Sequence, residues 1–319
     1  MDRGRRAAAL AFILALGSLA ASSGPPLAEM RWLAPVADPV AALGWQPSEC
    51  LPAMRGGSPE AAQAVYVGRV AFRSPLLLGG QAARAGISCE TCHRNGRDNP
   101  GFLFPGASGA PGTADVTSSL FSSHRGNGID DPRPIPDLGG PRAALKVDHD
   151  PASWALETFI HGLITEEFDG PEPTPAVLTG LAAYVRALDP AACGPAMPLR
   201  ADDYLGDAIN GVVAADGALA AGDRATALAM LAAARARLGR LDERFAGLPR
   251  SLAELRRANA GLVRLQAQVR TDDRRARSAI GTWIRSARDL SPVLRRDEPR
   301  SLFNHRRLAA QAPLPRKGP

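Results

Sequence analysis

Two thiols and an imidazole lie within about one turn of chain in the stretch CETCH, residues 89–93. Cys89, Cys92 and His93 suit three kinds of site: a zinc half-site, a dithiol redox pair, or a covalently attached haem. Each of these sites implies a different architecture around the motif. The compartment, the number of other ligands and the flanking elements therefore decide what the chain folds into.

The first 23 residues have the layout of a secretory signal peptide. A basic stretch, Met1 to Arg6, precedes the apolar run AAALAFILALGSLAA and small residues around Ala20. This apolar run is short for a membrane span, although an uncleaved anchor is the alternative interpretation. We expect an exported, periplasmic protein with at most peripheral contact with the membrane.

The cysteine count discriminates between the three sites. Besides the motif pair, the chain contains only Cys50 and Cys193. A structural zinc site usually takes two such pairs, and a dithiol redox motif opens a helix after a strand, which the flanks here lack. CxxCH is instead the attachment pattern of haem c: in a helical turn both sulfurs can bond the haem vinyl groups while His93 faces the iron. The motif therefore predicts one covalently bound haem c.

Two helices are predicted on either side of the motif. Ser58 and Thr174 are N-cap residues, and each is followed by a proline at the first helical position. Apolar residues at helical spacing follow both caps. The pattern predicts helices that begin at these caps and run to Phe72 and Leu188.

Four residues in these helices are similar to a known helix crossing. Gly68 and Phe72, with Leu181 and Tyr184, resemble the Gly-x-x-x-aromatic and Leu-x-x-Tyr patterns at which the first and last helices of c-type cytochromes cross. Glycine permits the close backbone approach and the aromatic rings fill the angle. Two ordinary amphipathic helices are the alternative.

Three stretches resemble the bacterial di-haem cytochrome c peroxidases and their MauG-type relatives. They are GRVAFRSPLLLGGQAARAGISCETCH (68–93), PRPIPDL (132–138) and HDPASWALE (149–157), in the family's order within residues 58–192. The resemblance implies an all-α, cytochrome c-like haem domain with long irregular loops. The chain departs from the family in its single CxxCH, which excludes a relay between two haems, and in Pro151, where glycine is usual.

The second axial ligand of the iron separates an electron carrier from a peroxidase. No methionine lies between the motif and Cys193. His124, in a Gly/Ser-rich loop ahead of PRPIPDL, resembles the displaceable distal histidine of the peroxidases, and a surface-loop residue is the alternative. His149 is the second choice, with a structural role as its better interpretation. His161 and His305 are not expected to be ligands.

Three further polar residues receive roles by resemblance. Arg133 would meet a haem propionate, which a guanidinium fork suits, and an exposed loop arginine is the alternative. Glu166 and Glu167 stand at roughly the interval where the peroxidases keep a distal acid, which assists O–O cleavage by protonating the leaving oxygen. The favoured interpretation of both glutamates is nevertheless an acidic surface loop.

Cys50 and Cys193 flank the predicted haem domain, one before its first helix and one after its last. In an oxidising compartment, two unclaimed thiols that bracket a domain whose terminal helices touch are best explained as a disulfide. In the chain-entropy model a loop of this length stabilises the fold by about 4 to 5 kcal/mol.

Charge divides the chain into two units. Residues 24–199 contain 12 basic and 18 acidic side chains, net −6, whereas residues 200–319 contain 23 and 13, net +10. After the signal peptide (1–23) we expect an extended segment (24–57), the haem domain (58–199), a small helical bundle or hairpin (200–291) and a mobile Pro/Arg-rich tail (292–319).

The excess of arginine in the second unit does not predict a nucleic-acid site. The basic residues alternate with Ala and Leu at helical spacing, so a solvated helix face is the favoured interpretation, ahead of an acidic partner or an anionic lipid surface. An exported protein also rarely meets nucleic acid. A docking or dimerisation role for this unit rests on its charge alone.

These features predict a periplasmic mono-haem cytochrome that transfers single electrons between redox partners such as a cytochrome or a dehydrogenase. The alternative is a peroxidase-like enzyme that reduces hydrogen peroxide with electrons from an external donor. The carrier is favoured because a lone haem cannot store a second oxidising equivalent on a partner haem. A haem or gas sensor is a third class without specific support.

Overall fold

The computed structural model describes residues 27–52, 58–117, 120–126, 128–141 and 146–311. The predicted signal peptide lies outside these residues. Helices dominate the described structure, which confirms the all-α class. Its strands form two short antiparallel pairs, β1 (Trp45–Gln46) with β4 (Met197–Pro198) and β2 (Thr113–Ala114) with β3 (Arg133–Pro134).

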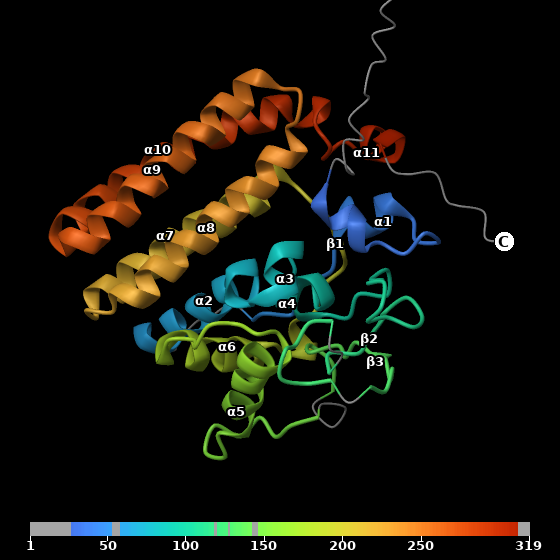
Figure 1. Cartoon of the computed structure of the whole chain (residues 1–319). Coiled ribbons are helices and arrows are strands. Elements are labelled where there is room, and N and C mark those ends of the chain that lie inside the picture. The colour runs from blue at the N-terminus through green and yellow to red at the C-terminus, as the bar shows by residue number, and fades with distance from the viewer. Residues whose placement is uncertain (1–26, 53–57, 118–119, 127, 142–145, 312–319) are drawn as a thin grey trace, which may run out of the picture.

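We call residues 27–199 the N-terminal lobe; most of it lies in the lower half of Figure 1, while its first residues, coloured blue, lie higher on the right. Its main helices are α2 (Pro59–Phe72), α5 (Ala155–Gly162) and α6 (Pro175–Ala187). Between Arg97 and Trp154 the described residues form turns and loops around β2 and β3, in agreement with the predicted irregular loops. The shorter helices are η1 (Ala28–Trp32), α1 (Pro39–Leu43), η2 (Pro75–Leu77), α3 (Gly80–Ala85), α4 (Cys89–Cys92), η3 (Arg94–Gly96), η5 (Leu163–Glu167) and η6 (Pro190–Ala192). Because η1 and α1 lie within residues 24–57, the expectation of an extended segment there is only partly correct.

The predicted crossing of α2 and α6 is present. The Ser58 hydroxyl accepts a hydrogen bond from the Ala61 amide, and the Thr174 hydroxyl accepts one from the Val177 amide, so both predicted N-caps are confirmed. A methyl group built on Gly68 would lie 1.8 Å from the carbonyl oxygen of Gly180. The backbones therefore touch at a point where only glycine fits.

Residues 200–297 form a bundle of four long helices above the N-terminal lobe (Figure 1). Consecutive helices are joined by short turns, and each helix packs on its neighbours, as predicted. None of the helices in the described ranges is long and apolar enough to cross a membrane. The bundle comprises α7 (Ala201–Ala220), α8 (Arg224–Arg244), α9 (Pro249–Thr271) and α10 (Asp273–Asp297).

The expectation of a mobile tail from residue 292 is wrong as far as residue 311. Helix α10 continues through Pro292 to Asp297, and η7 (Glu298–Arg300) and α11 (His305–Gln311) follow it. Leu308 is fully buried in a small apolar cluster that includes Leu27 and Leu43. The Nε2 atom of His305 also lies 3.0 Å from the Gly44 carbonyl oxygen. The C-terminal helix therefore closes on the start of the N-terminal lobe.

The N-terminal lobe and the bundle share one continuous hydrophobic core. A network of charges around the buried Asp207 also joins them: Arg69 of α2 pairs with Asp207 of α7 at 2.6 Å, and Arg237 of α8 pairs with the same carboxylate at 2.6 Å. Burial alone would raise the pKa of Asp207, but the charges of Arg237 and Arg69 hold it far below the ordinary value. Asp207 therefore stays ionised between two guanidinium groups.

Replacing Asp207 with asparagine is expected to destabilise the protein strongly. Arg237 would lose the carboxylate that it pairs with, and Arg69 would keep only Glu49 among the described residues. Breaking a buried ion pair in this way costs about 3 to 5 kcal/mol. Urea unfolding measures the loss. Asp289→Asn, the same change at an exposed position of α10, is the matched control and should cost less than about 0.5 kcal/mol. Equal losses in the two variants would show that the network adds nothing to stability.

Candidate functional site

The CETCH motif forms a single turn of helix, α4, which a local hydrogen-bond pattern fixes. The Ser88 amide donates to the Thr91 hydroxyl at 3.0 Å, and the His93 amide donates to the Cys89 carbonyl at 2.8 Å. The chain then turns sharply, because Asn95 adopts a left-handed conformation with φ 53°. Cys89 and Cys92 therefore lie on one helical turn, directly ahead of His93.

His93 is oriented by the loop that contains PRPIPDL. Its Nδ1 atom lies 3.0 Å from the carbonyl oxygen of Pro136. A carbonyl oxygen can only accept, so Nδ1 must carry the proton and Nε2 must present its lone pair. Burial lowers the pKa of His93 to about 4, which keeps the ring neutral at neutral pH. The ring is thus in the state that a metal ligand requires.

The two thiols of the motif are free cysteines in a partly buried, apolar setting. Burial raises the pKa of Cys89 and of Cys92 to about 12. A dithiol redox pair instead needs a thiolate, which enzymes of that kind obtain by lowering the pKa. The environment of the motif therefore disfavours the redox-pair interpretation.

The described residues contain no cluster of three or more His, Cys, Asp and Glu side chains that could hold a metal ion. Cys50 and Cys193, the other two thiols of the chain, are joined in a disulfide, as predicted. Neither of them is therefore a ligand for the motif.

Aromatic residues from the crossing helices pack behind the motif. The ring of Phe72 lies 6.4 Å from the imidazole of His93 and 5.2 Å from the ring of Tyr184. The Tyr184 hydroxyl donates to Glu49 at 2.9 Å. The crossing of α2 and α6 thereby reaches the motif through the aromatic side chain of Phe72.

The residues after the motif anchor its other side. Arg94 donates to the Trp45 carbonyl at 2.7 Å, and the Asn95 amide group donates to the Pro47 carbonyl at 2.9 Å. Asn95 also accepts from the buried Arg73 at 2.8 Å. These bonds tie the motif to the N-terminal segment and to α2.

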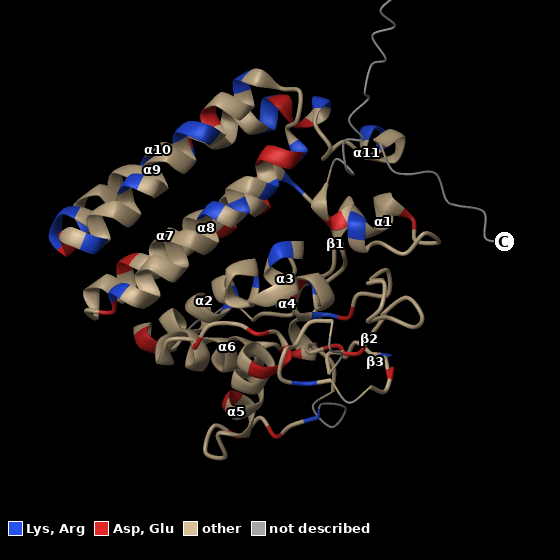
Figure 2. Cartoon of the chain, viewed as in Figure 1, with Lys and Arg blue, Asp and Glu red and all other residues tan. Residues whose placement is uncertain are grey.

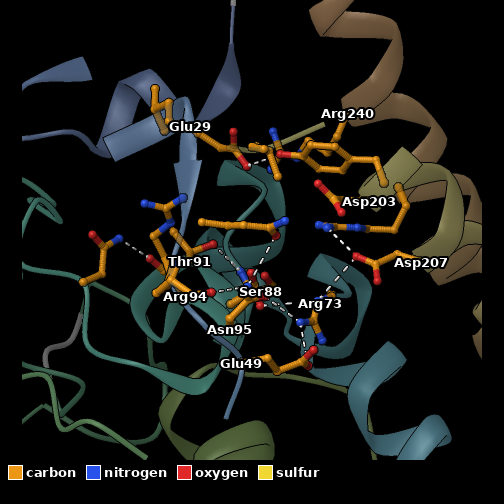
Figure 3. Close-up of a pocket in the computed structure, with 18 of the residues that line it drawn as sticks. Glu29, Glu49, Arg73, Ser88, Thr91, Arg94, Asn95, Asp203, Asp207 and Arg240 are labelled. Atoms are coloured by element: carbon orange, nitrogen blue, oxygen red, sulfur yellow. Dashed lines mark hydrogen bonds and ion pairs between the residues drawn. The ribbon is translucent and has the colours of Figure 1, made fainter. Parts of the chain in front are cut away.

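A polar cavity of about 910 Å³ lies on this anchored side, between the N-terminal segment, α4 and the bundle helices α7 and α8 (Figure 3). Ser88, Glu90 and Thr91 contribute to its wall, whereas Cys89, Cys92 and His93 do not. Figure 3 shows acidic and basic side chains facing one another across it, the labelled ones being Glu29, Glu49, Asp203, Asp207, Arg73, Arg94 and Arg240. The cavity is therefore separate from the surface that carries the thiols and the imidazole.

His124 lies on an exposed loop beside the segment that carries Glu166 and Glu167. Its side chain is 65% exposed, and its Nε2 atom is 3.8 Å from a carboxylate oxygen of Asp169. The neighbouring Arg125 pairs with Glu166 at 2.5 Å and with Glu167 at 2.9 Å. The structure thus places the loop of His124, the candidate second axial ligand, beside the two candidate acids, Glu166 and Glu167.

The two glutamates have different environments. Glu166 is exposed, in agreement with the favoured surface interpretation, and its hydrogen bond from Arg125 lowers its pKa. Glu167 is buried, which the sequence did not indicate, and burial raises its pKa. The Oε2 atom of Glu167 has no hydrogen-bond partner among the described residues. Glu167 is therefore the better candidate for a group that holds a proton.

Arg133 and His149 occupy less distinctive positions. Arg133 is 69% exposed and pairs with Asp131 at 2.5 Å. His149 is partly buried, and its carbonyl oxygen accepts a hydrogen bond from Arg186. Among the described residues, neither His124 nor Arg133 forms a hydrogen bond, ion pair or ring contact with the CETCH turn. The structure therefore assembles the motif itself and leaves His124 and Arg133 elsewhere on the lobe.

Comparison of this chain with protein-family models, with curated proteins and with solved structures gives no match.

Proposed function

We propose that this chain is an exported c-type cytochrome that holds one haem through Cys89 and Cys92 and binds its iron through Nε2 of His93. The hydrogen bond from His93 Nδ1 to the Pro136 carbonyl is the observation that supports this most directly. It fixes the tautomer and orients the ring, as the outer partner of a metal-bound histidine does. The free thiols on the preceding turn supply the two attachment points.

The proposed role is single-electron transfer. A haem c supplies an iron that alternates between two oxidation states, with a potential set by its ligands and surroundings. In this chain His93 would be one ligand, and Phe72 would pack beside it. The Cys50–Cys193 disulfide supports an oxidising compartment, in agreement with the predicted periplasmic location.

A peroxidase-like activity is the second candidate, and Glu167 is the observation that favours it. This buried carboxyl has a raised pKa and lies next to the loop of His124. A raised pKa brings a carboxyl group closer to the protonated form that general acid catalysis needs. In such an enzyme Glu167 would donate a proton to a leaving oxygen, and an external cytochrome would supply the electrons.

The optical and EPR spectra of the purified protein test the ligand set. With His124 as second axial ligand, the ferric protein should be low-spin at neutral pH and stay so on reduction, and His124→Ala should open the site to cyanide and carbon monoxide. His161→Ala is the matched control, because His161 is also partly exposed and pairs with Glu172 at 2.9 Å. A carrier should keep both ligands in both oxidation states. A peroxidase-like enzyme should release His124 on reduction and be oxidised rapidly by peroxide.

A high-spin iron that His124→Ala leaves unchanged would exclude His124. The second axial ligand would then be His149, or the site would be open.

A further inference from the structure

Trp154 is exposed at a position where the backbone is strained. Its side chain is 59% exposed, although tryptophan is among the largest apolar residues. Its backbone is left-handed, with φ 55° and ψ 10°, at the N-cap of α5, and its side chain makes no capping hydrogen bond. A bulky residue in this conformation is uncommon and costs free energy. The fold therefore exposes the indole of Trp154 to solvent at a cost in conformational free energy.

The turn that carries Trp154 is ordered by a series of hydrogen bonds. Asp148 accepts from the Asp150 amide at 3.0 Å, and Asp150 accepts from the Ala152 amide at 2.9 Å. The Ser153 hydroxyl donates to the Asp150 carbonyl at 2.9 Å. The backbone that carries the indole is thus ordered before any partner arrives, which reduces the entropy lost on binding.

Helix α6 fixes this turn to the rest of the lobe. Arg186 of α6 donates to the His149 carbonyl at 2.8 Å and forms a two-point ion pair with Glu157 of α5. Helix α6 also crosses α2 beside the CETCH motif. The exposed turn is therefore connected rigidly to the proposed haem site.

The surroundings of Trp154 are acidic. Asp148 and Asp150 are exposed in the same turn, and Asp169 and Glu172 follow α5. Residues 146–174 contain seven acidic side chains and one lysine. Helix α5 lies at the end of the molecule opposite to α9 and α10, where the arginine residues of the bundle gather (Figures 1 and 2). The exposed charges in the turn that carries Trp154 are thus mainly acidic, those of Asp148 and Asp150.

We propose that Trp154, with Asp148 and Asp150 around it, is the docking site for a basic redox protein that exchanges electrons with the haem. Tryptophan is enriched among the residues that dominate binding at protein interfaces. Complementary charge raises the rate of encounter and makes it sensitive to salt. This inference rests on the proposed function, because it names the partner of the same electron-transfer site.

Stopped-flow mixing of the purified haem protein with a reduced, basic mono-haem cytochrome c tests the proposal. At low salt the second-order rate constant should fall about tenfold in Trp154→Ala, since a central tryptophan usually dominates its interface. In Asp148→Asn/Asp150→Asn the rate constant should fall at 20 mM NaCl but change little at 200 mM, because salt screens this attraction. An acidic cytochrome c should react more slowly than the basic one with the unchanged protein.

Val263→Ala is the matched control, because Val263 is also an exposed apolar residue, 44% accessible, but lies on α9 of the bundle. Its rate constant should equal that of the unchanged protein. Rates within twofold of the unchanged protein in Trp154→Ala would overturn the proposed site, as would faster reaction with the acidic cytochrome. The haem content of each sample separates this failure from failure of the proposed function, since only the latter leaves the protein without covalent haem.

Discussion

Replacing both Cys89 and Cys92 with alanine is expected to abolish covalent haem attachment. In the unchanged protein, acidified acetone should leave the colour on the polypeptide, and the pyridine haemochrome should show the c-type band. The double variant has no sulfur at the motif with which to form thioether bonds. Any haem that it binds should therefore be extracted completely.

The disulfide provides the control for this experiment. Cys50→Ser/Cys193→Ser also removes two sulfurs from the chain, but it leaves the CETCH turn intact. It should keep its haem on extraction while losing stability. Extractable haem in the unchanged protein, or one bound zinc per chain and no haem, would disprove the proposed attachment.

Gly68→Ala is expected to lower the free energy of unfolding by more than about 3 kcal/mol, at the upper end of what overpacking costs. The added methyl group would lie 1.8 Å from the Gly180 carbonyl oxygen, a backbone atom that cannot turn aside. Helices α2 and α6 would have to separate, and the packing of Phe72 on Tyr184 would be lost with them. Urea unfolding followed by circular dichroism measures the change.

Gly239→Ala is the matched control for this substitution. Gly239 lies within helix α8, and a methyl group built there meets nothing within 4 Å. Because alanine favours helix more than glycine does, this variant should gain about 0.5 to 1 kcal/mol. If the two variants were equally stable, the close contact between α2 and α6 would not exist in solution.

The features predicted correctly are those that short stretches of sequence specify. Ser58 and Thr174 cap their helices through a hydroxyl that bonds an amide three residues away, so the neighbouring residues determine each helix start. The crossing at Gly68 was predicted from the resemblance of the Gly68/Phe72 and Leu181/Tyr184 patterns to the crossing helices of c-type cytochromes. The disulfide followed from counting, since Cys50 and Cys193 were the two cysteines left over.

The features that were missed depend on contacts between distant parts of the chain. The Pro/Arg-rich composition after residue 292 is typical of an unstructured tail. In the structure, Leu308 instead belongs to one buried apolar cluster with Leu43 of α1, more than 250 residues earlier. The acceptor for His93 is a backbone carbonyl at Pro136, and a main-chain group leaves no residue-type signal in the sequence. Glu167 and its neighbour Glu166 look alike in sequence, and only the packing of η5 buries one of them.

The disulfide determines how a pulling force would pass through the molecule. The Cα atoms of Cys50 and Cys193 lie 4.1 Å apart although 143 positions separate them in sequence. A force applied to the two ends of the chain would be transmitted through this covalent bond. Residues 51–192, including the CETCH turn, would therefore bear no force. Reduction of the bond would add roughly 470 Å of extensible chain, at about 3.3 Å per residue. A single-molecule stretching trace should therefore be much shorter for the oxidised protein, in which only the bundle and the two terminal segments unravel.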